Sequence, residues 1–268
     1  MTKRRWFGFL APSVTTRLSQ SLGAAVLLCL VIASPAAFAQ DSKPPEKLPP
    51  ARTTYLGRHI AQTMSFHGAP WLIRDNREDE ERVSMVFPQL QLKPGMTVCD
   101  MGCGNGFYTL EMAKMVAPGG KVIAVDIQQE MLHLLKLRAD EMQIKNVEPV
   151  LGTVTDPRIA DGVVDLLLMV DVYHEFSHPP QMLAAIRKSL KPNGLVALLE
   201  YREEDPMVPI KPEHKMSKRQ IMKEYRTNGF KLVREYDELP WQHLMFFGID
   251  SDWKGSKKSD DARDGADN

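Results

Sequence analysis

Short apolar segments that alternate with stretches of helical periodicity constrain this fold more than any other feature of the sequence. The apolar runs occupy residues 97–101, 121–126, 147–151, 163–172 and 195–201. They lack the polar alternation of a half-exposed strand, so we expect parallel strands that are buried on both faces. Between them, apolar residues recur at helical spacing, as in residues 106–117 and 182–190. Repeated strand–helix–strand units of this kind predict an α/β fold.

The segments on either side of these runs extend the predicted architecture. After a helix near residues 217–228, residues 231–237 and 241–249 have the composition of two further strands. We therefore expect a doubly wound, Rossmann-like, seven-stranded and mostly parallel sheet. Upstream, residues 55–66 and 78–90 are predicted to be helical and to form an N-terminal helical cap.

The two ends of the chain differ in composition from its centre. Residues 1–39 have a basic start, an apolar run, small residues and no acid, which predicts a signal peptide. Residues 40–54 are predicted to be a Pro-rich linker, residues 55–250 the main domain and residues 251–268 a disordered tail. We therefore expect an exported protein, either periplasmic or anchored in the membrane through an uncleaved signal segment and facing outward. The arginine pair near the start resembles a twin-arginine export signal.

Charge and cysteine content exclude several functional classes. The chain has 34 basic and 34 acidic residues and no basic stripe with interleaved aromatics, so nucleic acid is not expected as a partner. Cys99 and Cys103 are four positions apart, which matches neither the redox nor the haem-attachment motif. A disulfide between them stays open, and the sequence carries no signal for an oligomeric state.

A glycine-rich turn joins the first apolar run to the helix that follows it. The sequence from Asp100 is DMGCGNG, which places Gly102, Gly104 and Gly106 at alternate positions. Glycines let the backbone approach a ligand closely, and the following helix N-terminus adds N–H groups and positive potential. The second run ends in Asp126, whose carboxylate is suited to accept hydrogen bonds from ribose hydroxyls. The glycine spacing differs from the G-x-G-x-x-G of nicotinamide-binding proteins.

The segment VCDMGCGNG, followed by VIAVD, resembles the cofactor site of class I S-adenosylmethionine-dependent methyltransferases. The resemblance covers roughly residues 80–250 in motif order and strand spacing. It implies S-adenosylmethionine as cofactor and in-line transfer of its methyl group to a small-molecule acceptor. The cofactor-binding positions that it implies are Asp100, Gly102, Gly104, Gly106, Asp126, Ile127, Gly152, Thr153 and Asp171. Gly152 and Thr153 stand where the family often has an acid.

The end of the fourth apolar run supplies the candidate catalytic residues. This run ends in the sequence DVYHE, at the sheet edge where open α/β sheets bind ligands. The resemblance places Asp171 or Tyr173 beside the cofactor, and His174 and Glu175 toward the acceptor. A base is required where the attacking oxygen or nitrogen carries a proton. His174 is the first candidate because its unperturbed pKa lies near neutrality, and Glu175 is the second. A purely structural role for His174 stays open.

Residues 174–178 (HEFSH) also match the H-E-x-x-H motif of zinc metalloproteases. Such a site needs both histidines on one face of a helix, with the glutamate polarising a zinc-bound water. Pro179 follows directly and disfavours a helical conformation at His178, so we expect no metal. A zinc metallohydrolase that uses this motif, with His214 or His243 as third ligand, is one alternative. A second alternative is an exported, non-catalytic module that binds an adenosyl ligand.

Overall fold

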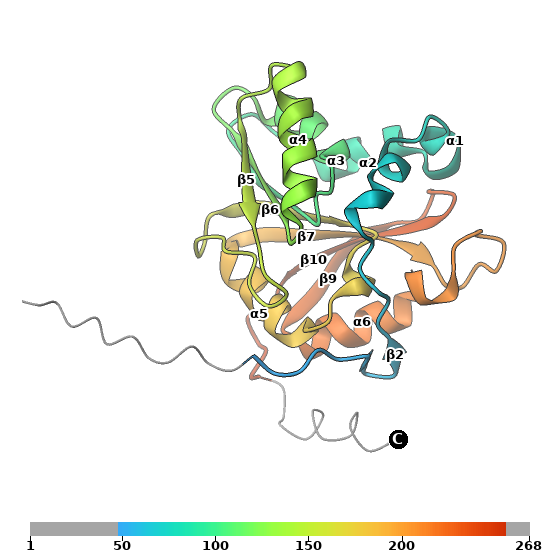
Figure 1. Cartoon of the computed structure of the whole chain (residues 1–268). Coiled ribbons are helices and arrows are strands. Elements are labelled where there is room, and N and C mark those ends of the chain that lie inside the picture. Colours follow the sequence, from blue (N-terminus) through green and yellow to red (C-terminus); the bar gives the residue numbers. More distant parts are fainter. Residues whose placement is uncertain (1–47, 256–268) are drawn as a thin grey trace, which may run out of the picture. The chain divides into compact units, whose positions relative to one another are not determined.

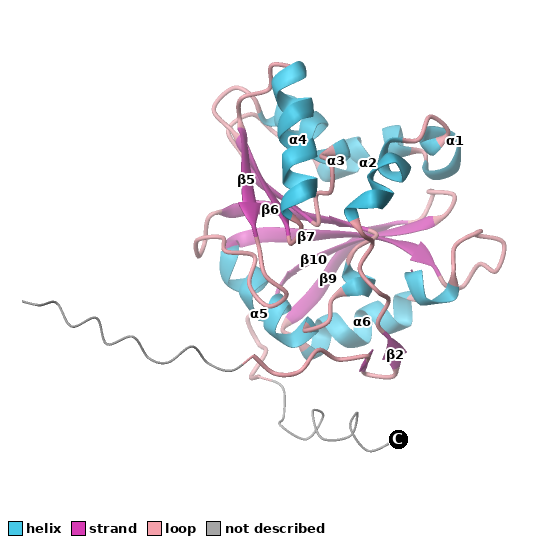
Figure 2. Cartoon of the chain, in the orientation of Figure 1, coloured by secondary structure: helices cyan, strands magenta, loops and turns pink. Residues whose placement is uncertain are grey.

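One eight-stranded sheet with helices on both faces organises the computed structural model, which describes residues 48–255 (Figures 1 and 2). Its strands are β3 (Thr97–Met101), β4 (Lys121–Asp126), β5 (Val147–Leu151), β6 (Val164–Val170), β7 (Leu190–Arg202), β8 (Lys215–Met216), β9 (Phe230–Tyr236) and β10 (Gln242–Ile249). The order across the sheet is β5-β4-β3-β6-β7-β10-β9, and β8 pairs with β7. Among these strands, β10 alone runs opposite to the rest, so its pairs with β7 and β9 are antiparallel and the other pairs are parallel. The doubly wound, mostly parallel sheet is therefore confirmed.

The helices form a layer on each face of the sheet. One layer, in the upper part of Figure 1, contains α1 (Arg77–Glu81), α2 (Val83–Leu90), α3 (Phe107–Val116) and α4 (Gln129–Glu141). The opposite layer contains α5 (Pro179–Ser189) and α6 (Lys218–Thr227). The α5 helix begins with two prolines, which fit the first helical turn because its N–H groups have no partner within the helix.

The central strand β3 shows why the strand sequences are continuous apolar runs. Val98 belongs to a buried cluster that includes side chains of α2 and α3, whereas Cys99 and Met101 belong to one that includes side chains of α5 and α6. Each face of the strand is thus covered by a helix layer, which removes the need for a polar face. Burying a large aliphatic side chain contributes roughly 1.5–3 kcal/mol, so both layers stabilise the strand.

The N-terminal region is the part of the fold that the sequence predicts least well. The expected helix at residues 55–66 is wrong: the chain forms the short strands β1 (Thr54–Tyr55) and β2 (Arg58–His59), then reaches the 3-10 helix η1 (Phe66–Ile73). Long-range contacts hold this segment, including a hydrogen bond from the Ala61 amide to the His174 carbonyl at 3.1 Å. The helix expected at residues 78–90 is present as α1 and α2, which are separated at Arg82, where φ is 51°.

The predicted signal peptide lies outside the described residues, as do most of the predicted linker and tail. Among residues 48–255, no helix combines the length and the apolar character that a membrane span requires.

Candidate active site

A cavity opens at the carboxyl ends of the parallel strands, where the order of the sheet reverses between β3 and β6. This is the position at which open α/β sheets bind ligands. The space between its lining residues is about 830 Å³, the open solvent at its mouth included. Four loops from the sheet and the segment before η1 line it, through residues that include Met64, Leu72, Gly102, Gly104, Asp126, Ile127, Gln128, Thr153, Asp171, Val172 and Glu175.

The glycine-rich turn brings bare backbone to the cavity wall. Gly102 and Gly104 have φ values of 71° and 53°, a left-handed conformation that favours glycine. A Cβ on Gly102 would lie 2.4 Å from Val172 Cγ2, and one on Gly104 would lie 2.5 Å from Leu72 Cδ1. Side chains at these two positions would therefore disturb the wall itself. Gly106 precedes α3 and is not part of the lining.

Asp126 and Ile127 present a polar and an apolar group side by side. Asp126 is buried, and its two carboxylate oxygens accept hydrogen bonds from the amides of Gly104 and Gln128, both at 2.9 Å. Burial raises the pKa of this carboxyl above its ordinary value. Each oxygen retains a second lone pair, which could accept a hydrogen bond from a ribose hydroxyl. Ile127 is 41% exposed although it is apolar, so a ligand ring could cover it.

Besides Gly106, two predicted cofactor residues lie outside the lining: Asp100 and Gly152. Asp100 is buried beneath the glycine turn and accepts a hydrogen bond from Thr109 Oγ1 at 2.5 Å. Burial raises the pKa of Asp100 to about 6. The Gly152 amide donates to the carbonyl of Asp126 at 2.9 Å, whereas Thr153 reaches the cavity. The structure thus gives Asp100 and Gly152 positions that support the wall.

Asp171 lies in the lining in a strained backbone conformation, with φ of 50°. Its Oδ2 accepts a hydrogen bond from Gln242 Nε2 at 2.7 Å. Burial, together with the nearby carboxylates of Glu81 and Glu200, raises the pKa of Asp171 well above its ordinary value. Asp171 therefore places a carboxyl group in the cavity wall, and Gln242 of β10 holds that group by a hydrogen bond.

Two side chains of the cavity lining, Gln128 and Glu175, hold the segment between β2 and η1 by hydrogen bonds. Gln128 accepts a hydrogen bond from the Phe66 amide at 2.8 Å and donates one to the Met64 carbonyl at 2.9 Å. Glu175 accepts a further hydrogen bond from the Met64 amide at 3.1 Å. Sequence reasoning missed this crossing because it predicted a helix there, and no motif marks Gln128.

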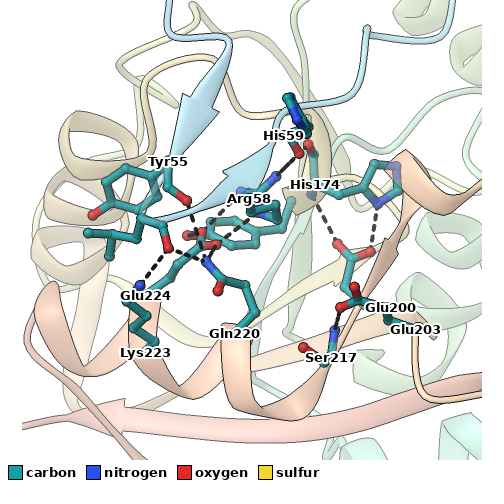
Figure 3. A network of polar contacts seen from close by, with 12 residues as sticks. Tyr55, Arg58, His59, His174, Glu200, Glu203, Ser217, Gln220, Lys223 and Glu224 are labelled. Carbon is teal, nitrogen blue, oxygen red and sulfur yellow. Dashed lines mark hydrogen bonds and ion pairs between the residues drawn. The ribbon is translucent and has the colours of Figure 1, made fainter. Parts of the chain in front are cut away.

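The predicted catalytic residues fall into two environments. Glu175 lines the cavity, and burial raises its pKa to about 7. Tyr173 is fully buried outside the lining, and its hydroxyl donates to Glu224 Oε2 at 2.7 Å. Glu224 also pairs with Arg58, the residue at the centre of Figure 3. Of these two predicted residues, only Glu175 reaches the cavity.

His174 is 2% exposed, and both of its ring nitrogens have partners. Its Nδ1 lies 2.6 Å from Glu200 Oε2, and Figure 3 shows the two side chains facing each other. Its Nε2 lies 3.0 Å from Nδ1 of His214. His174 itself is not part of the lining, although its neighbour Glu175 is. The pairing with His214 has no local signal in the sequence, because forty residues separate the two histidines.

The H-E-x-x-H motif does not form the helical zinc site that its spelling suggests. His174 lies in the 3-10 helix η2 (Tyr173–Glu175), and α5 begins only at Pro179. The ring of His178 contacts the Pro49 carbonyl and Ser177 Oγ, each at 2.9 Å. The two histidines are therefore not on one face of a helix. His243, the other candidate ligand, pairs with Glu204 at 2.8 Å.

Comparison with known proteins assigns the fold and the cavity to a family. The family described as a methyltransferase domain matches residues 92–250. The chain belongs to this methyltransferase family. A crystal structure of an S-adenosylmethionine-dependent methyltransferase from Aquifex aeolicus is 26% identical, with a TM-score of 0.66, and the match covers 70% of this chain and 100% of that one. Family and neighbour together imply S-adenosylmethionine as the cofactor.

Curated relatives of the chain are similar to it over part of their length. A demethylmenaquinone methyltransferase from Lactobacillus johnsonii is 33% identical over 42% of this chain and 47% of its own. An uncharacterized 37.1 kDa protein in a transposon of Streptomyces fradiae is 32% identical over 44% of this chain and 33% of its own. The chain thus spans between a third and a half of the length of these relatives.

The residues that line the cavity fit S-adenosylmethionine. Gly102 and Gly104 offer backbone without side chains, Asp126 offers a buried carboxylate, and Ile127 offers an exposed apolar surface. These groups match, in turn, an amino-acid portion, a ribose and an adenine. Glu175 belongs to the remaining wall of the cavity.

Proposed function

We propose that this protein transfers the methyl group of S-adenosylmethionine to a small-molecule acceptor, and that its acceptor side is marked by Glu175 and, behind it, His174. The observation that carries the proposal is that the glycine turn, Asp126 and Glu175 line one cavity in a chain of this family. When bound, the cofactor supplies a methyl carbon on a sulfonium; the acceptor's lone pair bonds to that carbon, and the electrons of the broken bond stay on sulfur.

The chain's own residues then have positioning roles rather than chemical ones. A sulfonium is already a good leaving group, so alignment of the acceptor and exclusion of water provide most of the acceleration. Gly102, Gly104 and Asp126 would hold the cofactor, while Met64 adds to the cavity wall and is held there by Glu175. Glu175 offers a carboxyl group on the wall away from the glycine turn, where an acceptor hydroxyl or amine would lie.

The first test is calorimetric titration of S-adenosylmethionine into the purified protein and into its Asp126→Asn variant. We expect saturable binding by the wild type. The substitution should weaken binding by about 1–3 kcal/mol, the range for a hydrogen bond lost from a buried group. That loss corresponds to roughly a 5- to 150-fold increase in Kd.

Asp140→Asn is the matched control, because Asp140 lies on the exposed surface of α4 and pairs with Lys136. It should leave Kd unchanged, and thermal melting should show that both variants are folded. Absence of binding by folded wild-type protein would contradict the cofactor role. Binding without methyl transfer to any member of an acceptor panel would favour the non-catalytic adenosyl-binding module.

We also propose that the protein acts outside the cytoplasm, on the basis of the signal-like composition of residues 1–39. Fusing these residues to a reporter that is active only after export tests this directly. An inactive reporter would contradict export without affecting the proposed chemistry.

A further inference from the structure

Three potential metal ligands converge beside the acceptor side of the cavity. One nitrogen each from His174 and His214 and a carboxylate oxygen from Glu175 all lie within 4.8 Å of one another. The nitrogens of the two histidines are 3.0 Å apart, and their rings stand nearly perpendicular, at 88°. Glu175 belongs both to this cluster and to the cavity lining, so the cluster adjoins the position proposed for the acceptor.

Glu200 orients the His174 ring, as a carboxylate often does for a metal-binding histidine. It is fully buried on β7, and its Oε2 lies 2.6 Å from His174 Nδ1 while Oε1 accepts from the His174 amide at 3.3 Å. In the tautomer whose Nδ1 carries the proton, His174 donates a hydrogen bond to Glu200. The lone pair of Nε2 is then free to face the cluster. Metal-binding histidines in proteins almost always have such a partner on their second nitrogen.

The backbone around the cluster is also fixed from several sides. The His174 carbonyl accepts a hydrogen bond from Arg58 Nη1 at 2.9 Å (Figure 3). It accepts another from the Ala61 amide at 3.1 Å. His214 ends the 3-10 helix η3 (Pro212–His214) and directly precedes β8, which pairs with the end of β7. Sheet pairing therefore delivers His214 next to the strand that carries Glu200. Ligands held by such rigid elements are preorganised for binding.

The donor set indicates a class of metal. Two imidazoles and one carboxylate suit first-row transition metals such as Fe²⁺, Co²⁺ and Zn²⁺ better than Mg²⁺ or Ca²⁺, which prefer oxygen ligands. Two nitrogens bound at about 2.1 Å and about 90° to one ion lie roughly 3.0 Å apart. The His174–His214 separation of 3.0 Å thus matches a pair of adjacent ligands.

We propose that His174 Nε2, His214 Nδ1 and the Glu175 carboxylate bind one divalent first-row transition-metal ion. This replaces the expectation from the sequence that no metal is present, and it uses His214 where the H-E-x-x-H motif would use His178. This role rests on the proposed methyl transfer: the ion would bind an acceptor hydroxyl oxygen beside the methyl group. A bound ion lowers the pKa of such a hydroxyl, whose proton leaves to water before the oxygen attacks.

The test measures metal binding alone, without S-adenosylmethionine, so that its failure is distinct from failure of the cofactor proposal. Chelator-treated, full-length protein is titrated with Co²⁺ and followed by visible absorption, and bound metal is counted by elemental analysis after dialysis. We expect about one Co²⁺ per chain. We expect His214→Ala to weaken Co²⁺ binding by at least tenfold and Glu200→Gln by roughly 10- to 100-fold.

His243→Gln and His178→Gln are the matched controls. His243 is a buried histidine paired with a carboxylate, as His174 is, but it lies outside the cluster. His178 tests the alternative motif directly. Both controls should bind Co²⁺ as the wild type does, with folding checked by thermal melting. Failure of folded wild-type protein to bind Co²⁺ would overturn the proposal, as would unchanged binding by His214→Ala or loss of binding by His178→Gln alone.

Discussion

The two sides of the cavity are built in different ways. The cofactor side consists largely of backbone, in a turn whose positive φ values require glycine, capped by the carboxylate of Asp126. On the proposed acceptor side, Glu175 lines the cavity. Behind it lie side chains from η2, β7 and η3 that sheet pairing brings together, and Arg58 holds the His174 carbonyl. The first can be recognised in a short motif, whereas the second exists only once the chain has folded. This difference predicts that the two sides respond differently to substitution.

The largest expected effect comes from breaking the buried ion pair behind the acceptor side. Arg58 Nε lies 2.8 Å from Glu224 Oε1, and the two side chains are 7% and 0% exposed. Glu224→Ala leaves the guanidinium of Arg58 buried without its partner, so we expect the free energy of unfolding to fall by about 3–5 kcal/mol. Urea denaturation measures this loss.

The exposed pair of Lys136 and Asp140 gives the matched comparison, because both side chains are 64% exposed. Its loss in Asp140→Ala should cost less than about 1 kcal/mol. S-adenosylmethionine affinity should be largely retained by the folded fraction of Glu224→Ala. Equal losses of stability in the two variants would show that the Arg58 network does not support the acceptor side as described.

A smaller effect is expected at the glycine turn, where conformation and crowding can be separated. Gly102 and Gly162 have similar φ values, 71° and 67°, but an added Cβ is crowded only at Gly102. Gly162→Ala should cost about 1–2 kcal/mol for its left-handed backbone alone. Gly102→Ala adds an overpacking cost, for a total of about 2–4 kcal/mol, and should weaken cofactor binding.

The comparison of these two alanine variants uses urea denaturation and calorimetry. Similar stabilities would mean that Val172 moves aside without cost. Weakened cofactor binding in Gly162→Ala would be equally contrary to expectation, since Gly162 is not part of the cavity.

The smallest expected effect is a pH dependence from Asp100 under the turn. Its pKa is raised to about 6 in the folded protein, chiefly by burial, whereas an unfolded aspartate has a pKa of about 3.9. The folded state therefore binds more protons between about pH 4 and pH 6, and the stabilisation is lost as pH rises through this window. The loss should be between about 1 and 3 kcal/mol.

Unfolding of the wild type and of Asp100→Asn, measured across this pH range, isolates the contribution of Asp100. The stability of the wild type relative to the variant should fall as pH rises and become constant above about pH 6. A difference that does not change with pH would show that Asp100 titrates normally in the folded state.

The sequence predicts the parts of this molecule whose signal is local. Strands β3, β4, β6 and β7 are predictable because each contains an apolar run that is largely buried, whereas the edge strand β5 has three exposed residues. The cofactor wall is predictable because Gly102, Gly104 and Asp126 stand at fixed places after strands. The segment at residues 55–66 misleads because its helical pattern is overridden by contacts such as that from Ala61 to His174. The His174–His214 pair could not be predicted, since it depends on β8 pairing with β7.

Glu175 takes part both in the hydrogen bond that holds the Met64 segment and in the cluster with the two histidines. One oxygen accepts the Met64 amide, and the same carboxylate belongs to the cluster with His174 and His214. We expect any rotation of this side chain toward the histidines to lengthen or break its hydrogen bond to the Met64 amide. The rate at which the Met64 amide exchanges its hydrogen with solvent is therefore a local gauge of carboxylate orientation, one that can be read without knowing the acceptor.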